Sequence, residues 1–343
     1  MLLFAIATLV PVALLGAAAI LGGVWVWLAV GYITVFTYLM DRLIARTTPN
    51  APDGEFPTGE PLSLLLALAH FALLALAIWA IGTPHLGMID KFGALIGFGL
   101  FFGQISNPNA HELIHKPGRR LRTLGKAVYI TLLFGHHASA HPLVHHIHVA
   151  TDADPNSAPL GMGFWRFAIR AWRGGLIAGY HAENSLRARA ATQPTPLTHP
   201  YIGYAIGTLL TLIATLLIAG PSGIAALICL AAYAQLQLLL SDYVQHYGLR
   251  RRPGPNTRPE TVGPQHSWNA PHWYSSAVML NAPRHSDHHL RPSRPYPGLH
   301  LDTKTMPTLP HSLPVMAVIA LWPALWRRVM DRRVAKWQTP ATA

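Results

Sequence analysis

Residues 2–22, LLFAIATLVPVALLGAAAILG, form an apolar run without a charged side chain, and a second run, VWVWLAVGYITVFTYLM at 24–40, follows after one residue. A helix crosses a bilayer with about 20 mainly apolar residues, so the two runs predict a tight hairpin of membrane helices. The N-terminus lacks the basic region and the small-residue cleavage site of a signal peptide. We therefore expect the first run to be retained as a span.

Four more apolar runs of spanning length follow, at 61–81, 92–106, 201–219 and 223–240. The run at 92–106 is short, and we expect it to continue as a helix past the membrane. The sequence thus predicts an all-α integral membrane protein with six transmembrane helices in a single domain, 1–343.

Two weaker apolar stretches do not fit a span. The stretch 121–135 is interrupted by Lys126, and 313–326 contains Pro314 and Pro323. We interpret the first as an interfacial or re-entrant segment and place the second at the surface.

The composition supports a membrane protein and predicts its orientation. Apolar residues make up 51% of the chain and charged residues 12%, about half the charged share of soluble proteins. With six spans, Lys91 is the only one of the 26 Lys and Arg that lies on the side opposite the termini. Cytoplasmic loops are enriched in Lys and Arg, so we expect both termini and the hydrophilic segments 107–200 and 241–343 in the cytoplasm. The net charge of +12 then reflects topology and contact with membrane lipid, and not nucleic-acid binding.

Nine histidines form four short clusters in these hydrophilic segments. In chain order they are His111 and His115 in HELIHK, His141, His145 and His146 in HPLVHH, His246 in QHYG, and His285, His288 and His289 in RHSDHH. Neutral imidazole is a ligand for Fe, Cu, Zn and Ni. Nine imidazoles are too many for one ion but suit two, with four or five nitrogens each.

The spacing within the clusters predicts which imidazoles share a face. In HELIH the two histidines are four residues apart and lie on one side of a helix. H-x-x-x-H-H places its first and second histidines on one face and the third about 100° round, and H-x-x-H-H is expected to do nearly the same. Glu112, Asp242 and Asp287 lie within the clusters, and we expect them to accept the second N–H of ligand imidazoles. Asp152 and Asp154 closely follow the second cluster, and for Asp154 the role of a solvated loop acid is a plausible alternative.

Two other classes of protein are weighed against a paired-metal enzyme. HELIH alone matches the HExxH zinc-protease pattern, with Glu112 as the general base, but seven further clustered histidines disfavour it. A metal transporter would carry ligands through the depth of the membrane, whereas the predicted spans contain almost no ionisable residue besides His70.

Four motifs, HELIHK, HPLVHHIHVATDADPNSA, SDYVQHYGL and APRHSDHH, together resemble those of the membrane-bound alkane monooxygenase family, within the fatty acid desaturase and hydroxylase superfamily. The likeness covers about residues 35–335. It implies two non-haem Fe ions held by the nine histidines and terminal hydroxylation of n-alkanes to 1-alkanols with O2 at a cytoplasmic di-iron site. It also implies electrons from NADH through rubredoxin reductase and rubredoxin, and a place in the bacterial inner (cytoplasmic) membrane.

The chemistry implied by the resemblance favours iron, because cleaving an unactivated C–H bond needs a redox metal and zinc has no redox chemistry. A methyl hydroxylase of alkyl-aromatics and a fatty acyl desaturase are the nearest alternatives. One departure from the family is Ala140, which precedes the second cluster where a Glu is usual.

An external electron donor is expected, because the chain has no flavin or dinucleotide fingerprint and a single cysteine, Cys229. One cysteine excludes most iron–sulfur clusters. If arginines near the third and fourth clusters guide the donor, it should be acidic, as rubredoxins generally are. The candidates are Arg250, Arg251, Arg252, Arg258, Arg291 and Arg294.

Overall fold

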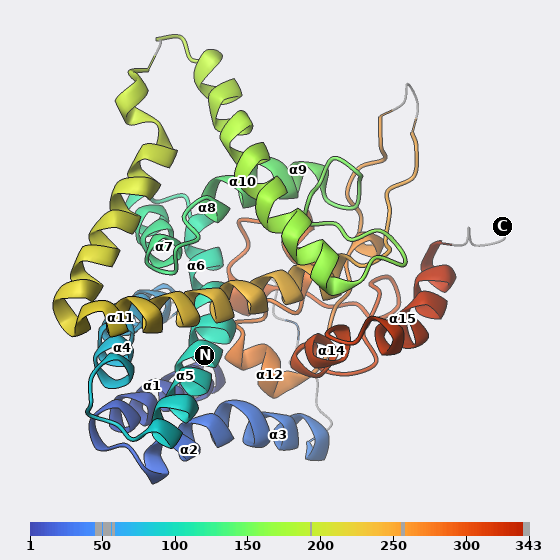
Figure 1. Ribbon diagram of the computed structural model, residues 1–343. Helices are drawn as coiled ribbons and strands as arrows, with labels where there is room; N and C mark the ends of the chain where they lie inside the picture. The colour runs from blue at the N-terminus through green and yellow to red at the C-terminus, as the bar shows by residue number, and fades with distance from the viewer. Residues whose placement is uncertain (45–49, 51–55, 57–58, 193, 255–257, 339–343) are drawn as a thin grey trace.

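The computed structural model describes residues 1–44, 50, 56, 59–192, 194–254 and 258–338, and every regular element in this part of the chain is a helix (Figure 1). The N-terminal hairpin is present. Helix α1 (Leu2–Leu21) turns at Gly22 and Gly23, whose φ angles of 62° and 56° favour glycine. Helix α2 (Val24–Gly31) then continues through a π-helical turn, Tyr32–Phe36, into α3 (Thr37–Leu43).

Five helical segments of the described residues are long and apolar enough to cross a membrane. They are Leu2–Leu21, Val24–Leu43, Gly59–Gly82 (α4), Met88–Ile114 and Pro200–His246 (α11). The fourth combines α5 (Met88–Phe101), a π-helical turn (Phe102–Ser106) and α6 (Asn107–Ile114). The helix therefore runs on from the apolar stretch into HELIH, as the sequence predicts.

The predicted runs 201–219 and 223–240 both lie in α11, so the structure has five candidate spans where the sequence predicts six. This element is kinked, because Ala219 and Gly220 have non-helical backbone angles and Pro221 follows them. Figure 1 shows its two halves running in different directions. Glycines let α5 and the π-helical turn that follows it approach the second half of α11 closely. A Cβ on Gly99 would overlap Tyr233, and one on Gly103 would overlap Gln237.

The weaker apolar stretches form short helices outside the candidate spans. Residues 121–135 contribute most of α7 (Arg119–Thr131), and 313–326 contribute α14 (Leu313–Ala320) and the start of α15 (Pro323–Gln338). Helix α10 (Phe164–Ala188) is also not among the candidate spans. Buried side chains of α10, α14, α15 and the end of α11, among them Phe164, Met316, Trp326 and Tyr243, form a second apolar core beside that of the membrane helices. The histidine-bearing segments lie among these elements.

Candidate metal centre

Four segments carry the nine clustered histidines. Helix α6 carries His111, His115 follows its last residue, and the end of α11 supplies His246. Residues 137–148 fold as α8 (His137–Ala140), a π-helical turn (His141–His145) and α9 (His146–His148). The short helix α13 (His285–Leu290) supplies the last three.

The structure brings all nine together in two groups. Group one contains His111, His115, His141, His146 and His288, and group two contains His145, His246, His285 and His289. Within each group one ring nitrogen of every histidine lies within 4.8 Å of the others. The nine residues selected from the sequence thus form one five-nitrogen and one four-nitrogen site.

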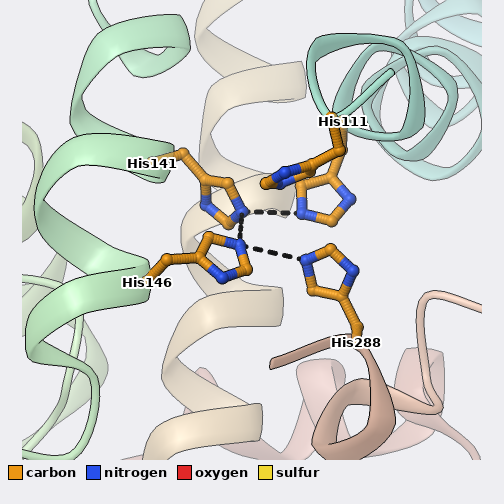
Figure 2. A group of neighbouring side chains, drawn as sticks. His111, His141, His146 and His288 are labelled. Carbon is orange, nitrogen blue, oxygen red and sulfur yellow. Dashed lines mark hydrogen bonds between the residues drawn. The ribbon is translucent and has the colours of Figure 1, made fainter. Parts of the chain in front are cut away.

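In group one the Nε2 atoms face a common centre. His141 Nε2 lies 2.7 Å from His111 Nε2 and 2.9 Å from His146 Nε2. His288 Nε2 lies 3.1 Å from His146 Nε2. Figure 2 shows these rings converging from three separate parts of the chain.

Group two has the same character and is more deeply buried. His285 Nε2 lies 2.9 Å from His246 Nε2 and 3.1 Å from His289 Nε2. The ring of His145 packs edge-on against those of His246 and His289, with centroids 4.6 and 4.9 Å away. The groups adjoin, since His146 of group one and His289 of group two have ring centroids 4.7 Å apart.

The assignment of histidines to groups corrects the face predicted from an ideal α-helix. His141 and His145 fall in different groups, and His141 pairs with His146 instead. The reason is the π-helical turn at His141–His145, in which residue i bonds to i+5 and brings residues five apart onto one side. In α13, His285 pairs with His289, four residues on, while His288 joins group one.

These nitrogens fit metal ions. Two ligands about 2.1 Å from a divalent ion and at right angles lie about 3 Å apart, which matches the observed Nε2 separations. His115 Nε2 and His145 Nε2 are buried with no hydrogen-bond partner. An ion in each group would satisfy these two nitrogens.

Burial also keeps most of these imidazoles neutral, as metal binding requires. It lowers the pKa of His115 to about 4 and that of His285 to about 3. The pKa values of His141, His146 and His288 fall well below the usual value, through burial and then through neighbouring histidines.

His145 is different because Asp154 lies beside it. Burial alone would lower the pKa of His145, but the Asp154 carboxylate outweighs it and raises that pKa. His145 Nδ1 donates to Asp154 Oδ2 at 2.8 Å, and Ser157 Oγ donates to the same oxygen at 2.6 Å. The backbone N–H of Asn156 donates to Asp154 Oδ1. Asp154 is fully buried, so it orients the His145 imidazole, and the alternative of a solvated loop acid does not apply.

The three carboxylates predicted for this role bond elsewhere. Glu112 accepts from Lys116 at 2.7 Å and from the backbone N–H of Tyr296. Asp242 accepts from Asn156 Nδ2 at 2.6 Å. The third, Asp287, pairs with Arg291 and Arg294 and accepts from the backbone N–H of His300. Asp287 thus ties α13 to the loop that follows it. Proximity in sequence suggested all three, whereas Asp154 lies nine residues after its imidazole, in a turn.

A mainly apolar cavity of about 100 Å³ reaches both groups. His111 and His141 of group one and His285 of group two line it. Its other walls come from the π-helical turn Phe102–Ser106, α6, α11, α14 and the segment after α12 (Trp273–Val278), and include Leu238, Leu240, Met279, Leu313 and Ala317. His137 also lines it.

Comparison with known proteins agrees with the histidine motifs. A family model described as fatty acid desaturase matches residues 91–319. Alkane 1-monooxygenase 1 of Alcanivorax borkumensis is 31% identical over 305 residues, which cover 87% of this chain and 75% of that protein. Alkane 1-monooxygenase of Ectopseudomonas oleovorans is 30% identical over 305 residues, covering 87% and 76%. The chain belongs to the membrane-bound alkane monooxygenase family.

Membership in the alkane monooxygenase family confirms the resemblance and agrees with a multi-pass membrane protein. The hydroxylase component of xylene/toluene monooxygenase from Pseudomonas putida is also similar, at 23% identity over 311 residues, covering 89% of this chain and 81% of that protein. HELIH is then a histidine motif of a monooxygenase. The pairing of Glu112 with Lys116 agrees, since a protease base would be free to bind water.

Proposed function

We propose that this chain hydroxylates the terminal methyl group of n-alkanes to give 1-alkanols at a di-iron centre. The observation that carries the proposal is the mainly apolar cavity lined by histidines of both groups. Family membership supports the same chemistry, since relatives at about 30% identity are alkane 1-monooxygenases.

Group one would hold one iron through five imidazoles, and group two the other through four. Bound iron supplies the redox chemistry: one alkane, one O2, two electrons and two protons give one alcohol and one water. The protein's own part is orientation and exclusion of water. Leu238, Met279 and Leu313 give an alkane apolar walls, and Asp154 fixes the ring of His145.

Polar side chains in the same cavity suit the product. Asn107, Asp242 and Gln245 line it together with the apolar residues. They offer hydrogen bonds to a new hydroxyl group that an alkane lacks. The polar groups would therefore stabilise the alcohol at the centre but would not bind the alkane strongly.

The proposal includes six spans, with α11 crossing twice around its kink, in the bacterial inner membrane. Both termini and the metal centre would then face the cytoplasm, since Lys and Arg gather on that side.

Electrons would come from NADH through rubredoxin reductase and rubredoxin. Four of the six candidate docking arginines already have partners. Arg250 contacts Asp152, Arg251 donates to the Ile147 carbonyl, and Arg291 and Arg294 pair with Asp287. Arg252 and Arg258 are exposed, so these two are the best candidates to contact an acidic donor.

The test is product analysis with purified protein, Fe(II), rubredoxin, its reductase and NADH. An n-alkane under ¹⁸O2 should give the 1-alkanol with one ¹⁸O atom. Parallel assays with an alkyl-aromatic and an acyl substrate address the alternatives, of which the similarity to the xylene/toluene hydroxylase component favours the first. If a benzylic alcohol or a desaturated acyl chain forms and no alkanol does, the corresponding alternative replaces alkane hydroxylation as the function.

A further inference from the structure

A second, much smaller cavity lies against His141 on the side of α8 and α10. It measures about 10 Å³, and Ala140, His141, Val144, Asn156 and Gly175 are among its lining residues. A cavity of about 10–15 Å³ is the size of one water molecule. It is therefore too small for an organic ligand.

A buried donor adjoins this cavity. His141 Nε2 faces group one, so the ring's other nitrogen, Nδ1, carries the proton when Nε2 binds a metal. That Nδ1 is buried with no hydrogen-bond partner in the protein. Ligand imidazoles usually donate this N–H to a carboxylate, a carbonyl or water, as His145 does to Asp154.

Ala140 directly precedes His141 in the chain and lines the same cavity. Helix α10 packs over it with two glycines. A Cβ on Gly175 would lie 3.7 Å from the Cβ of Ala140 and 3.9 Å from Asn156 Oδ1, and one on Gly179 would lie 3.1 Å from the Ala140 backbone nitrogen. This close approach keeps the space to the size of a water molecule.

Asn156 offers an acceptor beside it. Its Nδ2 donates to Asp242 at 2.6 Å, which leaves Oδ1 directed to the Ala140 side, next to Gly175. A water needs two to four polar partners to occupy an internal site.

We propose that the cavity beside Ala140 is a structural water site, in which one water accepts the Nδ1–H of His141 and donates to Asn156 Oδ1. The water takes the part that a carboxylate plays for His145. It holds the ring of His141 toward group one, and Asn156 links it to Asp242 on the wall of the large cavity. The inference rests on the proposed function in one respect, that His141 binds iron through Nε2.

The test compares three variants for their affinity for Fe(II) alone, measured by competition with a chelator. Ala140→Val fills the cavity with methyl groups and displaces the water. Ala140→Ser supplies a hydroxyl in the same place. The control is Ala138→Val, which adds the same bulk at another buried alanine of α8 that does not line the cavity. Circular dichroism and size-exclusion chromatography establish that each variant is folded.

Ala140→Val should weaken binding of one of the two irons by about 10–100-fold, the usual cost of losing a partner of a ligand imidazole. Ala140→Ser and Ala138→Val should bind like the parent. Equal affinity in Ala140→Val, or an equal loss in Ala138→Val, would overturn the water site. If Ala140→Val does not fold, a high-resolution cryo-EM map of the parent provides the test. Density for a water within hydrogen-bond distance of His141 Nδ1 and Asn156 Oδ1 would support the site, and the absence of such density would overturn it. This test measures metal affinity and not turnover. A failure of the proposed alkane hydroxylation can therefore be distinguished from a failure of the water site.

Discussion

At the residue scale, the metal centre depends on imidazoles whose position in the fold, and not their abundance, gives them a role. His146 and His148 both lie in α9, yet only His146 belongs to a group. Eleven of the 20 histidines lie outside the two groups, so nearby ones such as His148 can serve as controls.

Replacing His141 with Ala should remove iron from group one and abolish hydroxylation, because His141 Nε2 is within 3 Å of two other ligand nitrogens. His148→Ala in the adjoining helix should keep both iron and activity. Iron per chain by mass spectrometry and alkanol formation are measured together. One tightly bound zinc and no iron in the parent would contradict the di-iron proposal.

Replacing Asp154 with Asn keeps the shape but removes the charge that faces His145. Iron affinity should fall by about 10–100-fold, with turnover falling in step. Asp152→Asn is the matched control, since the Asp152 side chain is 99% exposed. Titration with a competing chelator gives both affinities, and similar losses in the two variants would argue against a positioning role for Asp154.

The sequence alone predicts the nine histidines but not their supporting residues. Clustered histidines have few uses other than metal binding, so composition and spacing were sufficient to predict that these nine come together. The sequence indicates the role of Asp154 less clearly, because its contact with His145 depends on the turn at Asp154–Ser157. In this turn the Asn156 backbone N–H and the Ser157 hydroxyl donate to the Asp154 carboxylate and hold it in place. Glu112 and Asp287 were predicted because they lie between clustered histidines in sequence. Their carboxylates instead pair with Lys116, and with Arg291 and Arg294, respectively.

At the element scale, α14 forms one wall of the large cavity and offers a way to test its role. Ala317 lines the cavity, while its neighbour Val318 is 55% exposed. Ala317→Phe should shorten the space available to a substrate and shift products toward shorter alkanols, without loss of iron. Val318→Phe adds comparable bulk outside the cavity and should leave the product profile unchanged. Gas chromatography of products from a mixture of alkanes measures both, and an unaltered profile in Ala317→Phe would exclude this cavity as the substrate site.

The elements themselves were largely predictable, because apolar runs of spanning length have few alternatives. The irregularities were not. The π-helical turn at His141–His145 decides which histidines share a group, and nothing in HPLVHH distinguishes it from an α-helical turn. The sharp kink between 201–219 and 223–240 likewise depends on Ala219 and Gly220, whose non-helical backbone angles the sequence does not reveal.

At the scale of the whole molecule, the orientation in the membrane can be tested with single cysteines. Cys229 is the only native one, so Cys229→Ser provides a background without thiols. In intact cells an impermeant thiol reagent should label Pro84→Cys, in the loop after α4, and should not label Pro253→Cys. Both positions are exposed. The reverse pattern would overturn the proposed topology.

The supply of electrons is the other property of the whole molecule, because the proposed hydroxylation consumes two electrons and the sequence has no flavin or dinucleotide fingerprint and a single cysteine. Activity should therefore require rubredoxin, its reductase and NADH. If Arg252 and Arg258 attract an acidic donor, the rate at limiting rubredoxin should fall as salt rises, since the screening length shrinks from about 30 Å at 0.01 M to about 8 Å at 0.15 M. Charge reversal by Arg252→Glu should raise the rubredoxin concentration needed for half the maximal rate, with iron content unchanged.

Arg251 is a poor site for the same substitution, because it holds the Ile147 carbonyl beside group one and its loss would disturb the centre directly. Arg189→Glu, an exposed residue following α10, changes net charge equally and serves as the control. An equal effect of both reversals would mean that rubredoxin responds to the overall charge of the protein and not to a face near the centre. Full activity with NADH alone would refute the separate donor, whereas a rate independent of salt would refute only the docking face.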